Sequence, residues 1–147
     1  MDGMKLAVNG TLMRGFELEK NLLAVDAKFL EETKTQKSYR LWSIHDKNPA
    51  MIRVSPEDEK AVKVEVEVWK VPYEGLAKVL EQEPEGLSIG KVALENGEIV
   101  LGVIGEPELV KGMKEISQYG GWKNYITLTM KQHEGNKTGE SDDYKNQ

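Results

Sequence analysis

The feature that most constrains the fold is a nine-residue segment, 61–69, in which apolar and charged side chains alternate. The apolar side chains on one face are Val62, Val64, Val66 and Val68, and the charged ones on the other are Lys63, Glu65 and Glu67. A period of two residues predicts a β-strand. One face of this strand would meet the core and the other would meet water, which argues against a strand buried on both faces.

The period changes after Pro72. Apolar side chains then recur at helical spacing, as Tyr73, Leu76, Ala77 and Leu80, and predict an amphipathic helix. Two apolar runs, 87–94 and 99–104, follow on either side of Asn96-Gly97. Asn and Gly tolerate the positive φ angles that a tight turn demands, so these runs predict a β-hairpin.

Shorter elements are expected before and after this region. A strand at 5–8 leads through a glycine-bracketed loop, 9–15, into a short helix that carries Leu18 and Leu22 four residues apart. Further strands are expected at 27–35, 39–44 and 51–54.

The C-terminal part shows a second helical pattern. It opens at Pro107 and continues through Leu109, Val110, Met113 and Ile116. Gly120-Gly121 ends it, and a short final helix is expected from the spacing of Trp122, Tyr125 and Ile126.

One domain, 1–131, with a polar tail, 132–147, is the expected organisation. The chain has 147 residues, enough to bury a core without disulfides or a structural metal. Tyr144 is the only large apolar side chain in the tail, so little there would offset the entropy cost of ordering.

Composition narrows the functional classes. The chain has no cysteine and two widely separated histidines, so we expect no metal and no cofactor. A net charge of -5 provides no electrostatic footprint for nucleic acid or an anionic membrane. No apolar run approaches the ~20 residues that span a bilayer, and no secretory segment is visible, which makes the cytoplasm the expected location.

Two catalytic motifs are weak. Residues 86–90 match G-x-S-x-G, but a hairpin rather than a helix follows Ser88, and the only downstream histidine, His133, lies in the tail. His45 is followed by Asp46 at the end of an expected strand. No second polar partner can be placed beside it, so an exposed turn histidine is the favoured interpretation.

The loop 9–15 is a better candidate for a binding site. A glycine-containing turn after a strand directs backbone N–H groups outward, where they hold a carboxylate or a developing oxyanion. Arg14 would add a bidentate contact to a carboxylate. The alternative is an ordinary strand-to-helix turn with a solvent-facing arginine.

Three carboxylates crowd the segment 80–86: Glu81, Glu83 and Glu85. If one of them turned into a pocket, desolvation and its neighbours would raise its pKa into the range of a general acid or base. The alternative is a solvated charged loop.

Three stretches, 64–72, 87–97 and 116–125, resemble the C-terminal domain of allophanate hydrolase, and the resemblance extends over about 6–126. It implies the gamma-glutamylcyclotransferase-like fold. This is a mixed α/β (α+β) domain with a curved, barrel-like sheet, a few short helices and a small-molecule cavity.

The resemblance also implies site residues. Loop 9–15 looks like the family's substrate-holding loop, usually Tyr-Gly-Ser/Thr-Leu in the cyclotransferases, with agreement at Gly10-Thr11-Leu12. The implied substrate-binding residues are Asn9, Gly10, Thr11, Leu12 and Arg14. Glu85, followed by Gly86, stands about where the cyclotransferases keep a catalytic glutamate, with Glu83 and Glu81 as alternates.

This chain differs from the allophanate hydrolase family at positions that bear on the reaction. The allophanate hydrolase domain carries Gly-Ala-His-Leu, in which the histidine is a proposed base in decarboxylation, whereas this chain has Asn9-Gly10-Thr11-Leu12. We also expect no amidase domain, because 147 residues are too few to hold one beside this domain.

The leading hypothesis is a stand-alone allophanate hydrolase C-terminal-like protein of urea and allophanate-type nitrogen metabolism. It would bind or process a small carboxylated amine or amide, as an enzyme of hydrolase or lyase type. One alternative is gamma-glutamylcyclotransferase-type acyl transfer with a glutamate as acid and base. Another is a non-catalytic interaction module for a separate amidase, favoured if Trp122 and Tyr125 are exposed. The expected partners are the small ligand and either such an amidase or a second copy of the chain.

Overall fold

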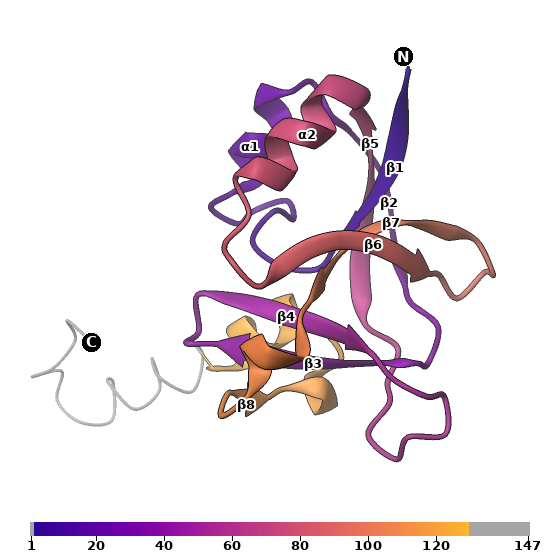
Figure 1. Ribbon diagram of the computed structural model, residues 1–147, viewed down its shortest axis with the longest axis vertical. Coiled ribbons are helices and arrows are strands. Elements are labelled where there is room, and N and C mark those ends of the chain that lie inside the picture. The colour runs from indigo at the N-terminus through magenta and orange to yellow at the C-terminus, as the bar shows by residue number, and fades with distance from the viewer. Residues whose placement is uncertain (1, 130–147) are drawn as a thin grey trace, which may run out of the picture.

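The computed structural model describes residues 2–129, which form two β-sheets and short helices (Figure 1). The elements are β1 (Gly3–Val8), α1 (Glu19–Ala24), β2 (Lys28–Lys34), β3 (Tyr39–Ile44), β4 (Asn48–Arg53), β5 (Glu65–Pro72), α2 (Tyr73–Glu81), β6 (Leu87–Ala93), β7 (Ile99–Gly105), η1 (Pro107–Val110), β8 (Lys114–Glu115) and η2 (Ser117–Tyr119). A last helix covers 122–129. The expected tail, 132–147, lies outside the described residues.

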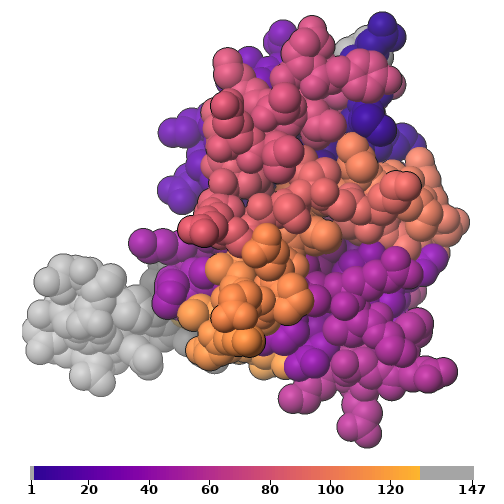
Figure 2. Space-filling view, viewed as in Figure 1, coloured from indigo at the N-terminus to yellow at the C-terminus, as the bar shows by residue number. Residues whose placement is uncertain are grey.

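The larger sheet has the strand order β2-β5-β1-β7-β6, and the smaller one has the order β4-β3-β8. Strand β1 pairs antiparallel with β5 and parallel with β7, so it lies in the middle of the larger sheet. The segment after β7, which includes η1, packs over β3 and β4 and joins the two sheets (Figure 2).

Lys63 and Glu65 are exposed, as expected for the charged face of this segment, but Glu67 on the same face is buried, so the expectation was wrong at that residue. Val66 and Val68 lie on one face, and Glu67 and Trp69 on the other, and each is at most 6% exposed. The second face is covered because the loop after β1 folds back over it, with Arg14 against Glu67. The strand also begins at Glu65, later than the alternation predicted.

The helix and the hairpin that follow β5 are confirmed. Helix α2 begins at Tyr73 and packs against α1, where Gly75 lies so close to Val25 that a side chain would collide with it. Strands β6 and β7 pair in register from Leu87↔Gly105 to Ala93↔Ile99. Gly97 in the connecting turn has φ +93°, the left-handed conformation expected there.

The second helical pattern was wrong beyond its first turn. Residues 107–110 form only a 3-10 turn, and Gly112 adopts φ +76°, which no α-helix accommodates. The chain then pairs β8 with β3, and the Ile116 N–H donates to the Leu41 carbonyl at 2.7 Å. Ile116 was apolar at helical spacing because it enters the core, not because it lies on a helix. The last helix, in contrast, begins at Trp122 as predicted.

The larger sheet curves until its two edge strands meet at one end. Thr35, just after β2, bridges Leu94, just after β6. Two backbone hydrogen bonds of 2.9 Å flank this bridge, from Gln36 N–H to the Ala93 carbonyl and from Glu95 N–H to the Lys34 carbonyl. The expected mixed α/β fold with a curved sheet is therefore confirmed.

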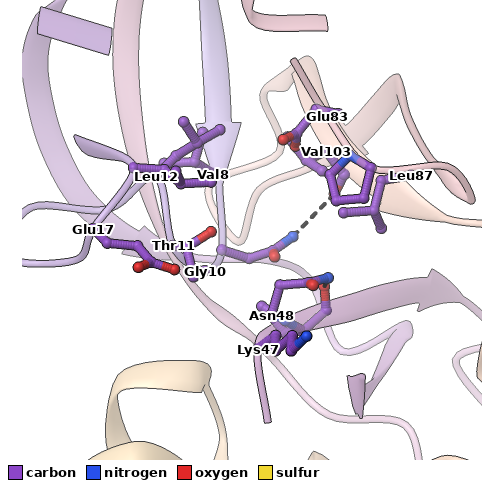
Figure 3. A pocket seen from close by; sticks show the side chains of 14 residues that line it. Val8, Gly10, Thr11, Leu12, Glu17, Lys47, Asn48, Glu83, Leu87 and Val103 are labelled. Carbon is purple, nitrogen blue, oxygen red and sulfur yellow. Dashed lines mark hydrogen bonds between the residues drawn. The ribbon is translucent and has the colours of Figure 1, made fainter. Parts of the chain in front are cut away.

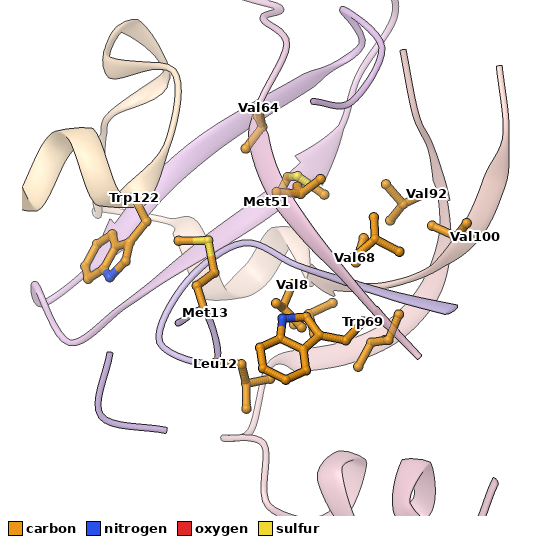
Figure 4. Close-up of a cluster of buried hydrophobic side chains, with 14 of the residues drawn as sticks. Val8, Leu12, Met13, Met51, Val64, Val68, Trp69, Val92, Val100 and Trp122 are labelled. Carbon is orange, nitrogen blue, oxygen red and sulfur yellow. The ribbon is translucent and has the colours of Figure 1, made fainter. Parts of the chain in front are cut away.

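Buried apolar side chains lie on both faces of β5 and extend to the last helix (Figure 4). Trp69 and Trp122 are both 2% exposed and Tyr125 is 1% exposed. Because the rings of Trp122 and Tyr125 are buried, the exposed patch that would have favoured an interaction module is not formed by them. Within residues 2–129, no helix has the length and apolar character needed to cross a membrane.

Candidate functional site

A pocket of about 130 Å³ opens where β1 ends (Figure 3). Its wall is built from segments far apart in the sequence: 8–12, 17–18, 47–49, 83–84, and the strand residues Leu87 and Val103. Strand β1 delivers the loop to this place because it lies in the middle of the sheet, with a neighbour on either side of its last residues.

The loop after β1 is held by its own backbone, which leaves three N–H groups available. Met13 N–H donates to the Gly10 carbonyl and Leu18 N–H donates to the Thr11 carbonyl, each at 2.9 Å. The N–H groups of Gly10, Thr11 and Leu12 donate to no acceptor within residues 2–129. The loop thus keeps the donors that the sequence predicted for an anion.

Two neighbours fix the start of this loop. The side chain of Asn9 is buried, and its Nδ2 donates to the Val103 carbonyl at 2.9 Å, which ties the loop to β7 (Figure 3). Gly10 lies directly against the Pro49 ring. A Cβ at position 10 would approach the ring carbons Cγ and Cδ more closely than real carbon atoms do, so the loop requires glycine here.

Of the three candidate carboxylates, the structure brings Glu83 to the pocket. Glu83 is half-buried in its wall, and burial raises the pKa of this carboxyl from 4.5 to about 7. Glu81 and Glu85 are exposed and do not line the pocket. The chain turns after α2, with Leu87 N–H donating to the Pro84 carbonyl and Gly86 at φ +92°, and this turn leaves Glu85 outside.

Arg14 lies outside the pocket lining, which does not agree with its expected contact to the ligand. Its Nε donates to Glu67 at 3.1 Å and its Nη2 donates to Glu32 at 2.6 Å. The guanidinium also stacks over the Phe29 ring, with 3.6 Å between Cζ and the ring centre. The arginine thus fastens the loop to the sheet instead of reaching across the pocket.

Several lining residues were missed by the sequence analysis: Glu17, Lys47, Asn48 and Pro49. Lys47 to Pro49 belong to the β3–β4 hairpin, where no motif pointed to a site. They reach the pocket only because the smaller sheet packs beside β7, an arrangement without a local sequence signal. The pocket therefore combines two carboxylates, Glu17 and Glu83, with one ammonium group, Lys47.

The β3–β4 hairpin has an anchored turn. His45 and Asp46 both adopt positive φ, 55° and 58°, and Lys47 N–H closes the turn on the Ile44 carbonyl at 3.0 Å. Hydrogen bonds from Ser43 and then Tyr125 lower the pKa of Asp46 from its ordinary value. His45 is exposed, in agreement with its interpretation as a turn residue.

Curved sheet, pocket and loop together define a domain of the gamma-glutamylcyclotransferase-like fold. An AIG2-like protein from Mus musculus shares this fold, with a TM-score of 0.59 at 20% identity over 80% of this chain and 88% of that one. The family model "Allophanate hydrolase C-terminal domain" matches residues 4–127, and the chain belongs to that family.

Relatives fall into short and long proteins. A urea amidolyase from Lachancea kluyveri is 37% identical over 139 residues, which are 90% of this chain and 7% of that protein. Kluyveromyces lactis allophanate hydrolase is 32% identical with a TM-score of 0.82, over 88% of this chain and 22% of that one. A uropathogenic E. coli-specific protein is 46% identical with a TM-score of 0.82, over 86% of this chain and 98% of that one. This chain thus spans less than a tenth of the urea amidolyase and almost the full length of the E. coli protein's structure.

Proposed function

We propose that this domain binds a small carboxylate that also carries an amide or amine N–H, and that Glu83 exchanges a proton with it. The observation that carries the proposal is the placement of Glu83, whose pKa is raised to about 7, in the same pocket as the unpaired N–H groups of Gly10–Leu12. Membership of the allophanate hydrolase C-terminal domain family supports a role in urea- or allophanate-related nitrogen metabolism.

The size and charge of the pocket set the ligand class. A volume of about 130 Å³ is close to that of a cavity that holds benzene, so the enclosed part of the ligand has about six non-hydrogen atoms. Lys47 and the loop N–H groups attract one carboxylate. Glu17, and Glu83 when it is ionised, oppose a second negative charge and accept hydrogen bonds from an amide or amine, so a monoanionic amide is favoured over a dianion.

The chemistry follows from the same groups. Donors aimed at a developing oxyanion stabilise it, and an acid with a pKa near the working pH both takes and returns a proton. Gamma-glutamylcyclotransfer is a second candidate that uses these groups. In that reaction Glu83 takes the proton of the attacking α-amine, the loop N–H groups hold the oxyanion on the γ-carbonyl carbon, and Glu83 returns the proton to the leaving amine. The agreement at Gly10-Thr11-Leu12 favours this candidate.

A separate amidase is the proposed protein partner. The support is that the urea amidolyase and allophanate hydrolase relatives carry this domain as a small share of a longer chain.

Ligand binding can be tested by amide NMR with two isosteric probes, malonamate and malonate. Malonamate has one carboxylate and one amide, and malonate has two carboxylates. We expect malonamate to shift the Gly10, Thr11 and Leu12 amide signals and to bind roughly five- to tenfold more tightly than malonate, because one added charge close to Glu17 and Glu83 costs about 1 kcal/mol. Shifts confined to other amides, or tighter binding of malonate, would contradict the proposed ligand class.

Proton exchange can be tested with matched glutamine variants, Glu83→Gln and Glu85→Gln. The assay measures release of 5-oxoproline from gamma-glutamyl dipeptides and release of ammonia from small carboxylated amides. We expect Glu83→Gln to lower turnover about 10²–10⁴-fold, the usual contribution of an acid or base, and Glu85→Gln to leave it unchanged. Equal loss in both variants, or loss only in Glu85→Gln, would reject Glu83 as the proton carrier.

A further inference from the structure

A buried carboxylate, Glu67, lies in strand β5, next to the central strand β1, behind the loop that forms the pocket. Its side chain is 8% exposed. Glu67 Oε1 accepts hydrogen bonds from the Arg14 backbone N–H at 2.9 Å and from Trp69 Nε1 at 3.2 Å, and its Oε2 accepts one from Arg14 Nε at 3.1 Å. Both oxygens are therefore occupied, and two of the three bonds come from one residue of the loop.

Arg14 is held from two further directions. Its guanidinium stacks on Phe29, at 3.6 Å from Cζ to the ring centre, and its Nη2 donates to the exposed Glu32 at 2.6 Å. Glu67 differs from Glu32 because it binds the backbone as well as the side chain of Arg14. A carboxylate that contacts the main chain fixes where the chain runs, whereas a contact to the guanidinium alone leaves the main chain free to move.

The backbone between Gly10 and Arg14 has few degrees of freedom left. Met13 N–H closes a turn on the Gly10 carbonyl at 2.9 Å, and the next N–H, that of Arg14, is bound by Glu67. The Gly10–Leu12 N–H groups lie within this turn, so their direction is set by its two ends: Gly10 against Pro49, and Arg14 on Glu67.

We propose that Glu67 is a positioning residue for ligand binding: through Arg14 it fixes the turn that presents the Gly10–Leu12 N–H groups to the pocket. This inference rests on the proposed function, because it assigns a task to donors that the proposed function uses. Glu67 does not line this pocket. It acts from the opposite side of the loop.

Charge is essential to this arrangement. An ionised carboxylate accepts at both oxygens, and bonds between ionised partners are about twice as strong as neutral ones. In Glu67→Gln one oxygen remains for the Arg14 and Trp69 N–H groups, but the new NH₂ group faces the Arg14 Nε–H, and two donors repel. The variant therefore keeps the size of the side chain, removes the charge that strengthens the bond to the Arg14 backbone N–H, and replaces the bond from Arg14 Nε by a repulsive contact, which loosens the hold on the loop.

The test compares Glu67→Gln with Glu32→Gln in the full chain, by the amide NMR signals of Gly10, Thr11 and Leu12 and by the affinity for malonamate. Glu32→Gln is the matched control, because it removes a charge from the same guanidinium without touching the backbone. We expect Glu67→Gln to shift these three amide signals before any ligand is added and to weaken malonamate binding at least tenfold. Glu32→Gln should change the affinity less than twofold.

Val79→Ala controls for a general loss of stability, because it creates a cavity at a buried position of α2 that does not line the pocket. Val79→Ala should destabilise the fold without shifting the three signals or the affinity. Arg14→Lys keeps the backbone N–H bond and the positive charge, so it should bind malonamate more tightly than Glu67→Gln. If Glu67→Gln proves too unstable to study, weaker malonamate binding in Arg14→Gln than in Arg14→Lys tests the same hold on the loop.

Unchanged signals and affinity in Glu67→Gln would overturn the positioning role, as would equal effects in Glu67→Gln and Glu32→Gln. The failure of the proposed function gives a different result. In that case malonamate does not bind the unaltered protein, while the ligand-free amide signals still report whether Glu67 orders the loop.

Discussion

A half-buried acid with a raised pKa makes folding depend on pH in an unusual direction. Burial raises the pKa of Glu83 from 4.5 to about 7. Between these values the folded protein keeps a proton that the unfolded chain has lost. The folded state is therefore most favoured, as far as Glu83 is concerned, below about pH 4.5, where this carboxyl is protonated in both states. This part of the free energy of unfolding is lost as the pH rises through 7.

The size of this effect can be measured by urea unfolding between pH 4 and pH 8.5. Because one pKa unit corresponds to ~1.4 kcal/mol, and because Glu83 keeps some contact with solvent, we expect the loss to be on the order of 2 kcal/mol. Glu83→Gln should be free of this decline, whereas Glu85→Gln should retain it. A decline of equal size in Glu83→Gln would show that another group is responsible. The comparison is made as a difference between variants because other acids titrate over part of this range.

At the level of single residues, the sequence offered three candidate carboxylates and ranked Glu85 first, whereas the structure places Glu83 in the pocket lining. The choice depends on where α2 ends and on the left-handed conformation of Gly86, which together direct Glu83 inward and leave Glu85 exposed. Glu67 shows a similar limit. Its alternating position predicts exposure, and only the return of Arg14 over the strand makes its burial favourable.

One hydrogen bond joins the last helix to the β3–β4 hairpin. Tyr125 OH donates to Asp46 Oδ1 at 2.7 Å, and Ser43 Oγ donates to the same oxygen at 2.6 Å. Asp46 is in the turn just before Lys47, Asn48 and Pro49, which line the pocket. The helix thus supports one wall of the site from outside.

Tyr125→Phe removes this bond and should lower the free energy of unfolding by about 1.5–3 kcal/mol, the range for a hydrogen bond to a charged group. Because the bond lowers the pKa of Asp46, the loss should be fully present above about pH 4 and should shrink as the pH falls and Asp46 takes up a proton. Tyr119→Phe is the control, since the Tyr119 ring packs edge-on against Tyr125 at 5.0 Å between ring centres without this bond. Urea unfolding at pH 7 and pH 3 measures both. A loss that does not depend on pH would mean that the bond to the ionised Asp46 contributes little.

Elements with local signals were predicted well, and those defined by distant partners were not. The β6–β7 hairpin follows from Asn96-Gly97, a signal contained within the turn itself. The helical pattern after Pro107 has suitable spacing, but Gly112 and the pairing of β8 with β3 favour an extended path. The spacing of apolar side chains in this segment indicated that Ile116 is buried. It did not indicate whether the residue is carried by a helix or by an extended chain.

The curvature of the whole sheet is fixed at Thr35, where its edges meet. Thr35 is fully buried, its Oγ1 donates to the Gln36 carbonyl at 2.8 Å, and it accepts from the Val64 N–H at 2.9 Å. The side chain therefore links the end of β2 to the residue before β5, beside the bridge to Leu94.

Thr35→Val keeps the shape of this side chain and removes the hydroxyl. The Val64 N–H then loses its acceptor inside the core, so we expect a loss of about 1–3 kcal/mol in unfolding free energy. Thr35→Ser retains the hydroxyl and loses only a methyl group, so it should be less harmful. Urea unfolding measures the losses, and hydrogen exchange at the Val64 amide checks the cause. If Thr35→Ser costs more than Thr35→Val, packing rather than the hydrogen bond stabilises this junction.

The order in which the strands pair could not be predicted from the spacing of apolar residues. The parallel pairing of β1 with β7 joins residues about 95 positions apart, as Leu6 with Leu101, and nothing in either strand indicates its partner. The resemblance to a known domain supplied the fold instead, because it covers several elements at once. The resemblance also indicated the loop after β1. This part of the pocket wall comes from one short segment, so a local motif is enough to find it.

The close contact between Gly10 and Pro49 makes the two sides of the pocket wall depend on each other. In the Gly-Ala-His-Leu motif that the resemblance assigns to the allophanate hydrolase domain, alanine takes this position, and its methyl group would overlap the Pro49 ring of this chain. Grafting the histidine-bearing loop onto this chain would therefore require a second replacement, at Pro49, before the first is tolerated. The residue tolerated at position 10 therefore depends on the residue at position 49, although the two lie in separate segments of the chain.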